Sequence, residues 1–189
     1  MSDIILFLYH VAMRLRRWHI PLLPVFIQYA IRLGCACHIG LGARIGKHTH
    51  LAYGGLGTVI HPTAVIGRNV YIGTHVTIGG RSGHSSAPTI GDNCFIGTGA
   101  SVLGHITVGR DCVIGANAVV VDDLPARCCA AGVPSKVFRT DIDLAEYRTR
   151  HDMQFYVPLD QDQADLAEES AGHSQLPKTS QGYLWPRSP

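Results

Sequence analysis

Aliphatic side chains recur every six residues through the middle of this chain. The series runs in three blocks of constant phase: Leu33, Ile39, Ile45, Leu51; Ile60, Ile66, Ile72, Ile78; and Ile90, Ile96, Val102, Val108, Ile114, Val120. Ten of these fourteen positions are followed directly by glycine. A period of six fits neither a helix, with 3.6 residues per turn, nor a strand that alternates every two residues. It is typical of a parallel β-helix, in which each coil stacks on the last and buries a continuous aliphatic column.

A second set of inward positions lies four residues after each aliphatic residue. These side chains are mostly small, as at Cys37, Ala43, Cys94 and Ala118. A narrow coil has room for one bulky and one smaller inward residue on each face, and glycine suits corners where a side chain would be strained. Three hexads make one coil, so residues eighteen apart are expected to stack. The repeat predicts a mainly β fold of about five coils over residues 33–124.

Charge and size indicate one globular domain with two appendages. The 189 residues hold 16 Lys and Arg against 14 Asp and Glu, a net charge of +2, which is too balanced to indicate a nucleic-acid-binding protein. The one basic run, Arg14, Arg16 and Arg17, fits an exposed helix end better than a nucleic-acid patch.

The six cysteines indicate buried thiols rather than disulfides or a metal site. Cys37, Cys94 and Cys112 fall on the inward register, where a free cysteine acts as a small hydrophobic residue. The pairs at 35/37 and 128/129 lack the C-x-x-C spacing of a zinc site. We therefore expect no metal and a reducing, cytoplasmic compartment.

Residues 1–32 are predicted to form a helical segment. Ile4–Met13 is almost wholly apolar, but a bilayer span takes about 20 apolar residues, and no small-residue cleavage site follows closely. Pro21 and Pro24 separate it from a second apolar stretch, residues 25–33. Two short helices are expected to cap the open end of the β-helix or to pack against a neighbouring subunit. The alternative is peripheral contact of residues 4–33 with the inner face of a membrane, with Arg and Trp at the headgroups.

The other appendage is residues 140–189, after a β-helix domain of residues 33–139. Residues 141–154 are predicted to form a helix. From Gln161 onward the chain is rich in Asp, Gln, Ser and Pro, so it is expected to bury too little apolar surface to order itself.

Four segments of the repeat domain resemble the hexapeptide-repeat acyltransferases, specifically the serine acetyltransferase-like branch. They are G-L-G-T-V-I-H-P-T-A-V-I-G (55–67), V-T-I-G-G-R-S-G-H (76–84), A-P-T-I-G-D-N (87–93) and A-A-G-V-P-S-K-V (130–137). The resemblance covers a little over half of the chain. It implies a left-handed coil, a homotrimer with its active site between subunits, and acetyl transfer from acetyl-CoA.

Stacking at eighteen residues predicts a row of small residues that begins at Gly79 and runs through Gly80, Thr98 and Ala116. An extended pantetheine arm needs close backbone approach and amide partners, which small residues allow. In the family that this chain resembles, the CoA-contacting positions map onto the last three. Lys136, after the last coil, is expected to meet the CoA phosphates as a point charge. The alternatives are that small residues here only let the coil turn, and that Lys136 is a solvated lysine.

Acetyl transfer to a hydroxyl requires a base, usually a histidine. His84 is the first candidate, because it lies in a loop of six extra residues that is expected to project from the coil, and because Ser-Gly-His resembles the histidine loop of sugar acetyltransferases. His61 is the second, eighteen residues before Gly79, although Ile-His-Pro at the start of a coil also has a geometric explanation. Tyr53, His75 and Arg81 are expected to line the acceptor site.

The chain departs from serine acetyltransferases at two catalytic positions. Those enzymes pair an Asp with a His before the Gly-Gly loop, whereas the matching segments here, residues 37–39 and 52–55, read C-H-I and A-Y-G-G. They also have a large N-terminal helical domain that contributes to serine binding, against residues 1–32 here. We therefore expect a sugar or polysaccharide precursor as the acceptor. Serine O-acetylation, as in cysteine biosynthesis, is one alternative and an inactive trimeric scaffold is another. A carbonic anhydrase-like metal site using His61 and His84 has the least support.

Overall fold

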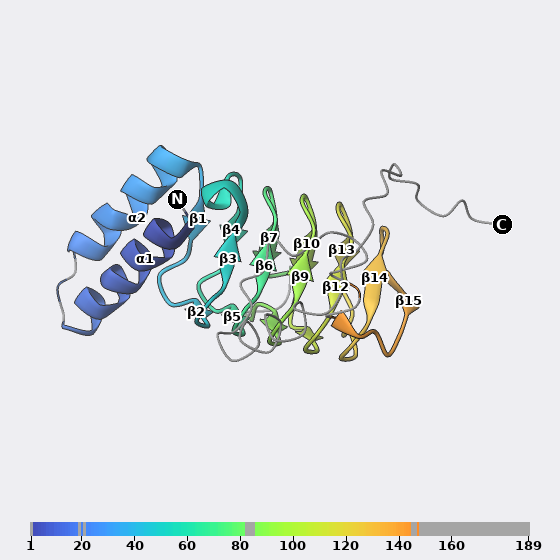
Figure 1. Cartoon of the computed structure of the whole chain (residues 1–189). Helices are drawn as coiled ribbons and strands as arrows, with labels where there is room; N and C mark the ends of the chain where they lie inside the picture. The colour runs from blue at the N-terminus through green and yellow to red at the C-terminus, as the bar shows by residue number, and fades with distance from the viewer. Residues whose placement is uncertain (1, 19, 21, 82–85, 145–146, 148–189) are drawn as a thin grey trace, which may run out of the picture. The chain divides into compact units, whose positions relative to one another are not determined.

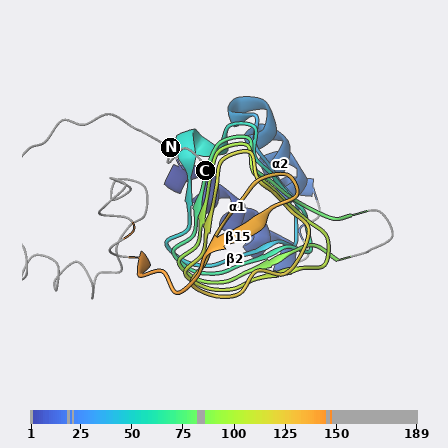
Figure 2. The ribbon, with the colours of Figure 1, turned by 90° about the vertical axis from the view of Figure 1, so that its right-hand side faces the viewer.

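The computed structural model describes residues 2–18, 20, 22–81, 86–144 and 147 (Figure 1). These residues belong to one compact unit, Met1–Pro158. Two helices, α1 (Ser2–Arg17) and α2 (Leu22–Cys35), precede a series of short strands. The strands wind into a coil that is triangular when viewed along its axis (Figure 2).

Each face of the triangular coil is one sheet. The first sheet holds, in order, β1 (His38–Ile39), β4 (Val59–Ile60), β7 (Thr77–Gly79), β10 (Ser101–Leu103) and β13 (Val119–Val120). The second holds β2 (Arg44–Ile45), β5 (Val65–Ile66), β8 (Thr89–Ile90) and β11 (Thr107–Val108). The third holds β3 (His50–Leu51), β6 (Tyr71–Ile72), β9 (Phe95–Ile96), β12 (Val113–Ile114), β14 (Cys129–Ala131) and β15 (Lys136–Arg139). All pairs are parallel except β14 with β15, and the chain visits the three sheets in turn, so the predicted parallel β-helix is confirmed.

The aliphatic column predicted from the period of six lies in the core. Twelve of its fourteen side chains are 2% exposed or less. The small inward positions, such as Cys37, Ala100 and Cys112, are buried beside them. The prediction is wrong for the first position, Leu33, which lies in α2 and is 85% exposed. The helix continues to Cys35, so the coil begins only at β1.

Coil length varies, and this corrects the expected stacking. Strands without an insertion between them do pair at eighteen residues, as Val59 pairs with Thr77. The first coil is 21 residues long, with His38 opposite Val59, because the 3-10 turn η1 (Ala52–Gly55) adds to it. The coil with the loop after β7 takes 24 residues, with Thr77 opposite Ser101. The prediction that residues eighteen apart stack is therefore wrong for residues on either side of that loop.

One corner of the coil is held by a ladder of side-chain amides. Asn69 Nδ2 donates to Asn93 Oδ1 (2.8 Å), and Asn93 Nδ2 donates to Asp111 Oδ1 (3.0 Å). All three residues have φ between 55° and 59°, a left-handed conformation that Asn and Asp tolerate better than most residues. The ladder therefore combines the conformation of a tight corner with hydrogen bonds between three successive coils.

Removing the middle rung should destabilise the coil. Asn93→Gly keeps the positive φ but deletes both hydrogen bonds, so we expect a loss of about 2 kcal/mol in the free energy of unfolding, measured by urea denaturation. Asn117→Gly is the matched control, because Asn117 is exposed at another corner with φ 55°. Equal losses in the two variants would show that the ladder contributes no stability.

The six cysteines are free thiols, and five of them are buried. Burial raises the pKa of the Cys37 thiol to about 12. Cys112 Sγ lies 3.0 Å from the carbonyl oxygen of Pro125, an arrangement in which a protonated thiol donates and a thiolate would be repelled. These cysteines act as core side chains, in agreement with their register in the sequence.

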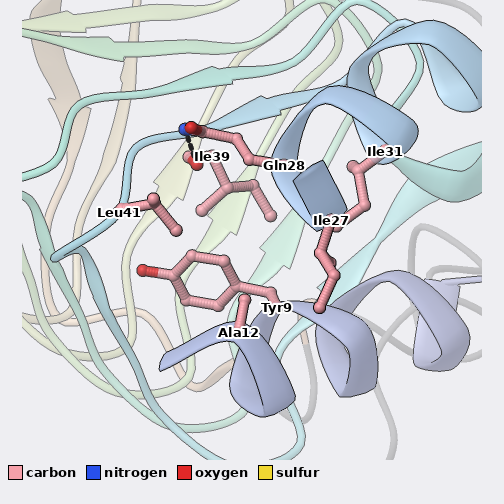
Figure 3. Close-up of a pocket in the computed structure, with 7 residues that line it drawn as sticks. All are labelled: Tyr9, Ala12, Ile27, Gln28, Ile31, Ile39 and Leu41. Carbon is pink, nitrogen blue, oxygen red and sulfur yellow. Dashed lines mark hydrogen bonds between the residues drawn. The ribbon is translucent and has the colours of Figure 1, made fainter. Parts of the chain in front are cut away.

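The N-terminal helices close the first coil, as one sequence-based alternative predicted. Tyr9, Ala12, Ile27 and Ile31 face Ile39 and Leu41 of the coil around a small pocket (Figure 3). The Tyr9 hydroxyl donates to the carbonyl oxygens of Gly40 (3.1 Å) and Ala43 (2.8 Å), and Gln28 Nε2 donates to Ile39 O (2.9 Å). Figure 2 shows α1 crossing behind the open triangle. Without this cap, the aliphatic column would end in water.

Pro24 lies within α2 rather than before it, at the third residue of the helix. A proline is tolerated there because the first N–H groups of a helix have no intrahelical acceptor. No helix in the described residues has the length and hydropathy that crossing a membrane requires.

The predicted helix at residues 141–154 and the predicted disorder from Gln161 lie mostly or wholly outside the described residues. Ile142 and Leu144 are described, and both are buried against Val113 and Cys129. The sequence did not indicate β15, which turns back and pairs antiparallel with β14.

Candidate functional site

Four of the predicted site residues gather where the strands of the first sheet end. We call this corner the His61 edge: His61, Gly79 and Gly80, with Arg81 following. The His61 backbone N–H donates to Ile78 O (2.8 Å), so His61 stacks beneath Gly79 as predicted. On the next coil Gly79 pairs with Leu103, and Gly104 N–H donates to Gly79 O (3.0 Å). Gly80 and Arg81 are exposed at this edge.

The His61 ring is engaged by its own turn. The backbone N–H of Thr63 donates to His61 Nδ1 (3.3 Å), and the Thr63 hydroxyl lies 3.0 Å from the same nitrogen. Since a backbone N–H can only donate, Nδ1 is the acceptor and the neutral ring carries its proton on Nε2. In this geometry His61 presents a donor, not a free base, away from the turn.

Two other predicted residues stack at the opposite end of the first sheet, where its strands begin. We call this corner the Thr98 edge: Thr74, Thr98 and Ala116. Gly99 N–H donates to Thr74 O (2.8 Å), and Asn117 N–H donates to Thr98 O (2.9 Å). Thr98 and Ala116 are exposed and in register, as predicted. Gly80 is not part of this row, and its place is taken by Thr74, because the loop makes the intervening coil 24 residues long.

Lys136 lies at the C-terminal end of the Thr98 edge. Val119 N–H donates to Gly132 O (3.0 Å), which continues the edge by one more coil. Lys136 of β15 is paired with Ala131, the residue before Gly132, and is exposed. An extended ligand lying along Thr98 and Ala116 would therefore approach a cation at that end.

Tyr53 and His75 also lie toward the Thr98 edge. His75 follows Thr74 directly, and its backbone N–H donates to Leu56 O (2.8 Å). Tyr53 is in η1, shortly before Leu56, with φ 49° and 78% of its surface exposed. Both side chains are available to a bound molecule, whereas Arg81 belongs to the other edge.

His84, the first candidate for the base, lies outside the described residues. Among the residues that the structure describes, no group of three His, Cys, Asp or Glu side chains could hold a metal ion.

Sequence reasoning missed Thr74, and the signal that would have found it was present. The grid shows one double-length step between Ile78 and Ile90. Adding those six residues to the coil makes 74, not 80, the partner of 98. The predicted row thus mixed residues of two edges that one whole sheet separates.

Comparison with known proteins supports the repeat. Residues 87–122 match the model of the family "Bacterial transferase hexapeptide (six repeats)". A serine acetyltransferase of Synechococcus elongatus is 36% identical over 131 residues, 68% of this chain and 53% of that protein. The chloroplastic serine acetyltransferase 1 of Arabidopsis thaliana is 45% identical over 118 residues, 61% of this chain and 37% of that protein.

Solved structures of the same kind share the fold. The serine acetyltransferase of Neisseria gonorrhoeae in complex with serine has a TM-score of 0.66 at 36% identity, covering 70% of this chain and 54% of that one. A serine acetyltransferase in complex with CoA has a TM-score of 0.64 at 31% identity, covering 70% and 55%. The chain thus spans about half the length of these structures. By its repeat, its fold and these matches, the chain is a hexapeptide-repeat protein of the serine acetyltransferase-like branch.

Proposed function

We propose that this chain transfers an acetyl group from acetyl-CoA to an acceptor hydroxyl. The observation that carries the proposal is the Thr98 edge, a row of small residues in register on successive coils, with Thr98 and Ala116 exposed, that leads to Lys136. Such a row would let the pantetheine arm approach the backbone, and Lys136 would meet the phosphates as a point charge. The similarity to serine acetyltransferases, one of them solved with CoA, supports the same cofactor.

The reaction needs no covalent enzyme intermediate. A base takes the proton of the acceptor hydroxyl as its oxygen attacks the thioester carbonyl, and the resulting oxyanion needs a nearby donor. When the intermediate collapses, the C–S bond breaks, the protonated base returns its proton to the sulfur, and CoA leaves as the thiol. We assign the base to His84. The Nε2–H of His61 suits the donor role better than the base role, because Nδ1 already accepts from Thr63.

We further propose that each active site forms between two copies of the chain, in a homotrimer. His61, Gly79 and Gly80 lie at one end of the first sheet, and Thr98 and Ala116 lie at the other. One pantetheine arm could touch both sets only if the His61 edge of one copy faces the Thr98 edge of the next. A closed ring of such head-to-tail contacts gives identical sites.

Serine is the acceptor that the comparisons favour. The relatives described above are serine acetyltransferases, one solved with serine. The sugar acceptor expected from the sequence rests mainly on the absence of the Asp and the His of those enzymes from residues 37–39 and 52–55, and has less support.

A coupled assay of CoA thiol release, run with L-serine and with a panel of simple sugars, tests both acceptors. Faster turnover on serine than on any sugar would support serine as the acceptor. Faster turnover on a sugar than on serine would support a sugar as the acceptor. Calorimetry with CoA distinguishes an inactive scaffold from an active acetyltransferase. Binding without turnover on any acceptor would favour the scaffold, and no binding would overturn the acetyl-CoA proposal.

Filling the Thr98 edge should block the cofactor. We expect Thr98→Trp to lower CoA affinity at least about tenfold, because the indole would occupy the space of the pantetheine arm. Arg110→Trp is the control, since Arg110 is exposed at the third corner of the coil, between β11 and β12, away from either edge. Unchanged affinity in Thr98→Trp, measured by calorimetry, would mean that CoA binds elsewhere.

Mixing two inactive variants tests the shared site. Thr98→Trp would fill the Thr98 edge and Gly80→Trp would fill the His61 edge, where Gly80 is exposed, so random trimers of equal parts keep both edges intact at about one site in four. Co-expression should therefore restore about a quarter of the wild-type activity. No recovery, with mixed trimers verified, would place both edges of a site in one copy.

A further inference from the structure

The two capping helices have an apolar face on the side away from the coil. In α1 the buried residues are Ile5, Leu6, Tyr9 and Ala12. Ile4, Phe7 and Trp18 project from the opposite side, because spacings of three and eleven residues return to nearly the same direction around a helix. Phe7 is 66% exposed.

Helix α2 repeats this arrangement. Pro24 and Ile31 are buried, while Leu22, Phe26, Tyr29 and Leu33 follow one another at spacings of four, three and four residues on the exposed side. Phe26 is 70% exposed. We call the exposed side of both helices the outer face: Ile4, Phe7, Trp18, Leu22, Phe26, Tyr29 and Leu33. Such a concentration of large apolar side chains in water marks a surface that is covered by something.

The charge of the helix pair selects the partner. Arg14, Arg17 and Arg32 are exposed, whereas Arg16 Nη1 donates to Leu41 O of the coil (2.6 Å). The two helices contain one acidic residue, Asp3. A second copy docking through the same face would bring two such cationic surfaces together, since a two-fold contact pairs like with like. An anionic partner with an apolar layer would neutralise the arginines and cover the apolar side chains.

We propose that the outer face binds the surface of an anionic lipid membrane, with α1 and α2 lying in the plane of the headgroups. The apolar side chains would enter the boundary of the acyl chains, and the arginines would meet lipid phosphates. Trp18 and Tyr29 are the amphipathic side chains preferred at that depth. This role is independent of the acetyl transfer proposed above, since neither edge of the coil contributes to it.

Fluorescence of Trp18 tests the insertion directly. The sequence has two tryptophans, so Trp185→Phe leaves Trp18 as the only one. Vesicles of phosphatidylglycerol and phosphatidylcholine in equal parts should shift its emission to shorter wavelength and carry the full-length protein in flotation. Pure phosphatidylcholine vesicles should do so weakly, and added salt should weaken the binding. Equal binding to both vesicles, or none to either, would overturn the proposal.

Two sets of variants separate lipid binding from a misfolded cap. Arg14→Gln combined with Arg17→Gln should lower vesicle affinity by at least about tenfold, at roughly fivefold per arginine. Phe7→Ser should lower it similarly, whereas Phe138→Ser, at a phenylalanine 62% exposed on β15, should not. Equal effects of the two serine substitutions would contradict a specific face. If the protein instead self-associates through the outer face as its concentration rises, without vesicles, the face belongs to a contact with a second copy.

Discussion

Gly97→Ala should destabilise the coil by about 3 kcal/mol or more, although it adds a single methyl group. The new Cβ would lie 2.6 Å from the backbone nitrogen of Ala116 and 2.9 Å from its Cα. Neither atom can rotate away as a side chain could. The spacing between these coils is set by hydrogen bonds such as Gly97 N–H to Ile114 O (2.8 Å), so relief requires that the ladder open locally. Urea denaturation followed by circular dichroism measures the loss.

Gly34→Ala is the matched control for this result. A Cβ at Gly34 would meet no atom within 4 Å, and the residue lies in α2. Alanine is favoured over glycine in a helix by up to about 1 kcal/mol, so this variant should be neutral or more stable. A loss below about 1 kcal/mol in the free energy of unfolding of Gly97→Ala would mean that the coils can move apart easily. Glycine would then not be required at that corner.

His84→Ala should lower kcat by about 100-fold or more, with little change in CoA affinity, because a general base acts on the acceptor proton and not on the cofactor. His61→Ala should also lower kcat, but by a smaller factor than His84→Ala, since His61 Nδ1 is already bonded within its turn and only its Nε2–H is offered to the oxyanion. Steady-state kinetics with the best acceptor measures both effects.

His10→Ala is the control for removing a surface histidine, because His10 is exposed on α1, outside both edges of the coil. A larger effect for His61→Ala than for His84→Ala would transfer the base to His61. It would also require that the contact with Thr63 breaks when the acceptor binds.

Much of the fold followed from local pattern. The aliphatic column, the small inward residues and the capping role of the apolar N-terminus were all predictable, because each depends only on which side chains must leave water. The errors arose at boundaries. Leu33 has the right spacing and the wrong element, since the end of α2 depends on how the helix docks on the first coil.

The candidate site was predictable one residue at a time but not as an arrangement. His61 beneath Gly79, and Thr98 beneath Ala116, are neighbours across coils without an insertion, and both predictions are confirmed. Gly80 and Thr98 are separated by the loop, so the prediction that they stack, which counted eighteen residues per coil, is wrong. The hydrogen bond between Thr63 and His61 was also beyond the sequence, because it depends on how one short turn folds back.

By itself, the sequence determined that this chain would wind into a coil with an aliphatic interior. The spacing of six between aliphatic residues is a local property, because it does not depend on which strands pair. Only the tertiary structure decided which residues share an edge. An insertion leaves the period intact but lengthens one coil, and every contact across that coil then depends on which strands pair. The division of the site residues into two separate edges, and with it the case for a site shared between copies, follows from that pairing.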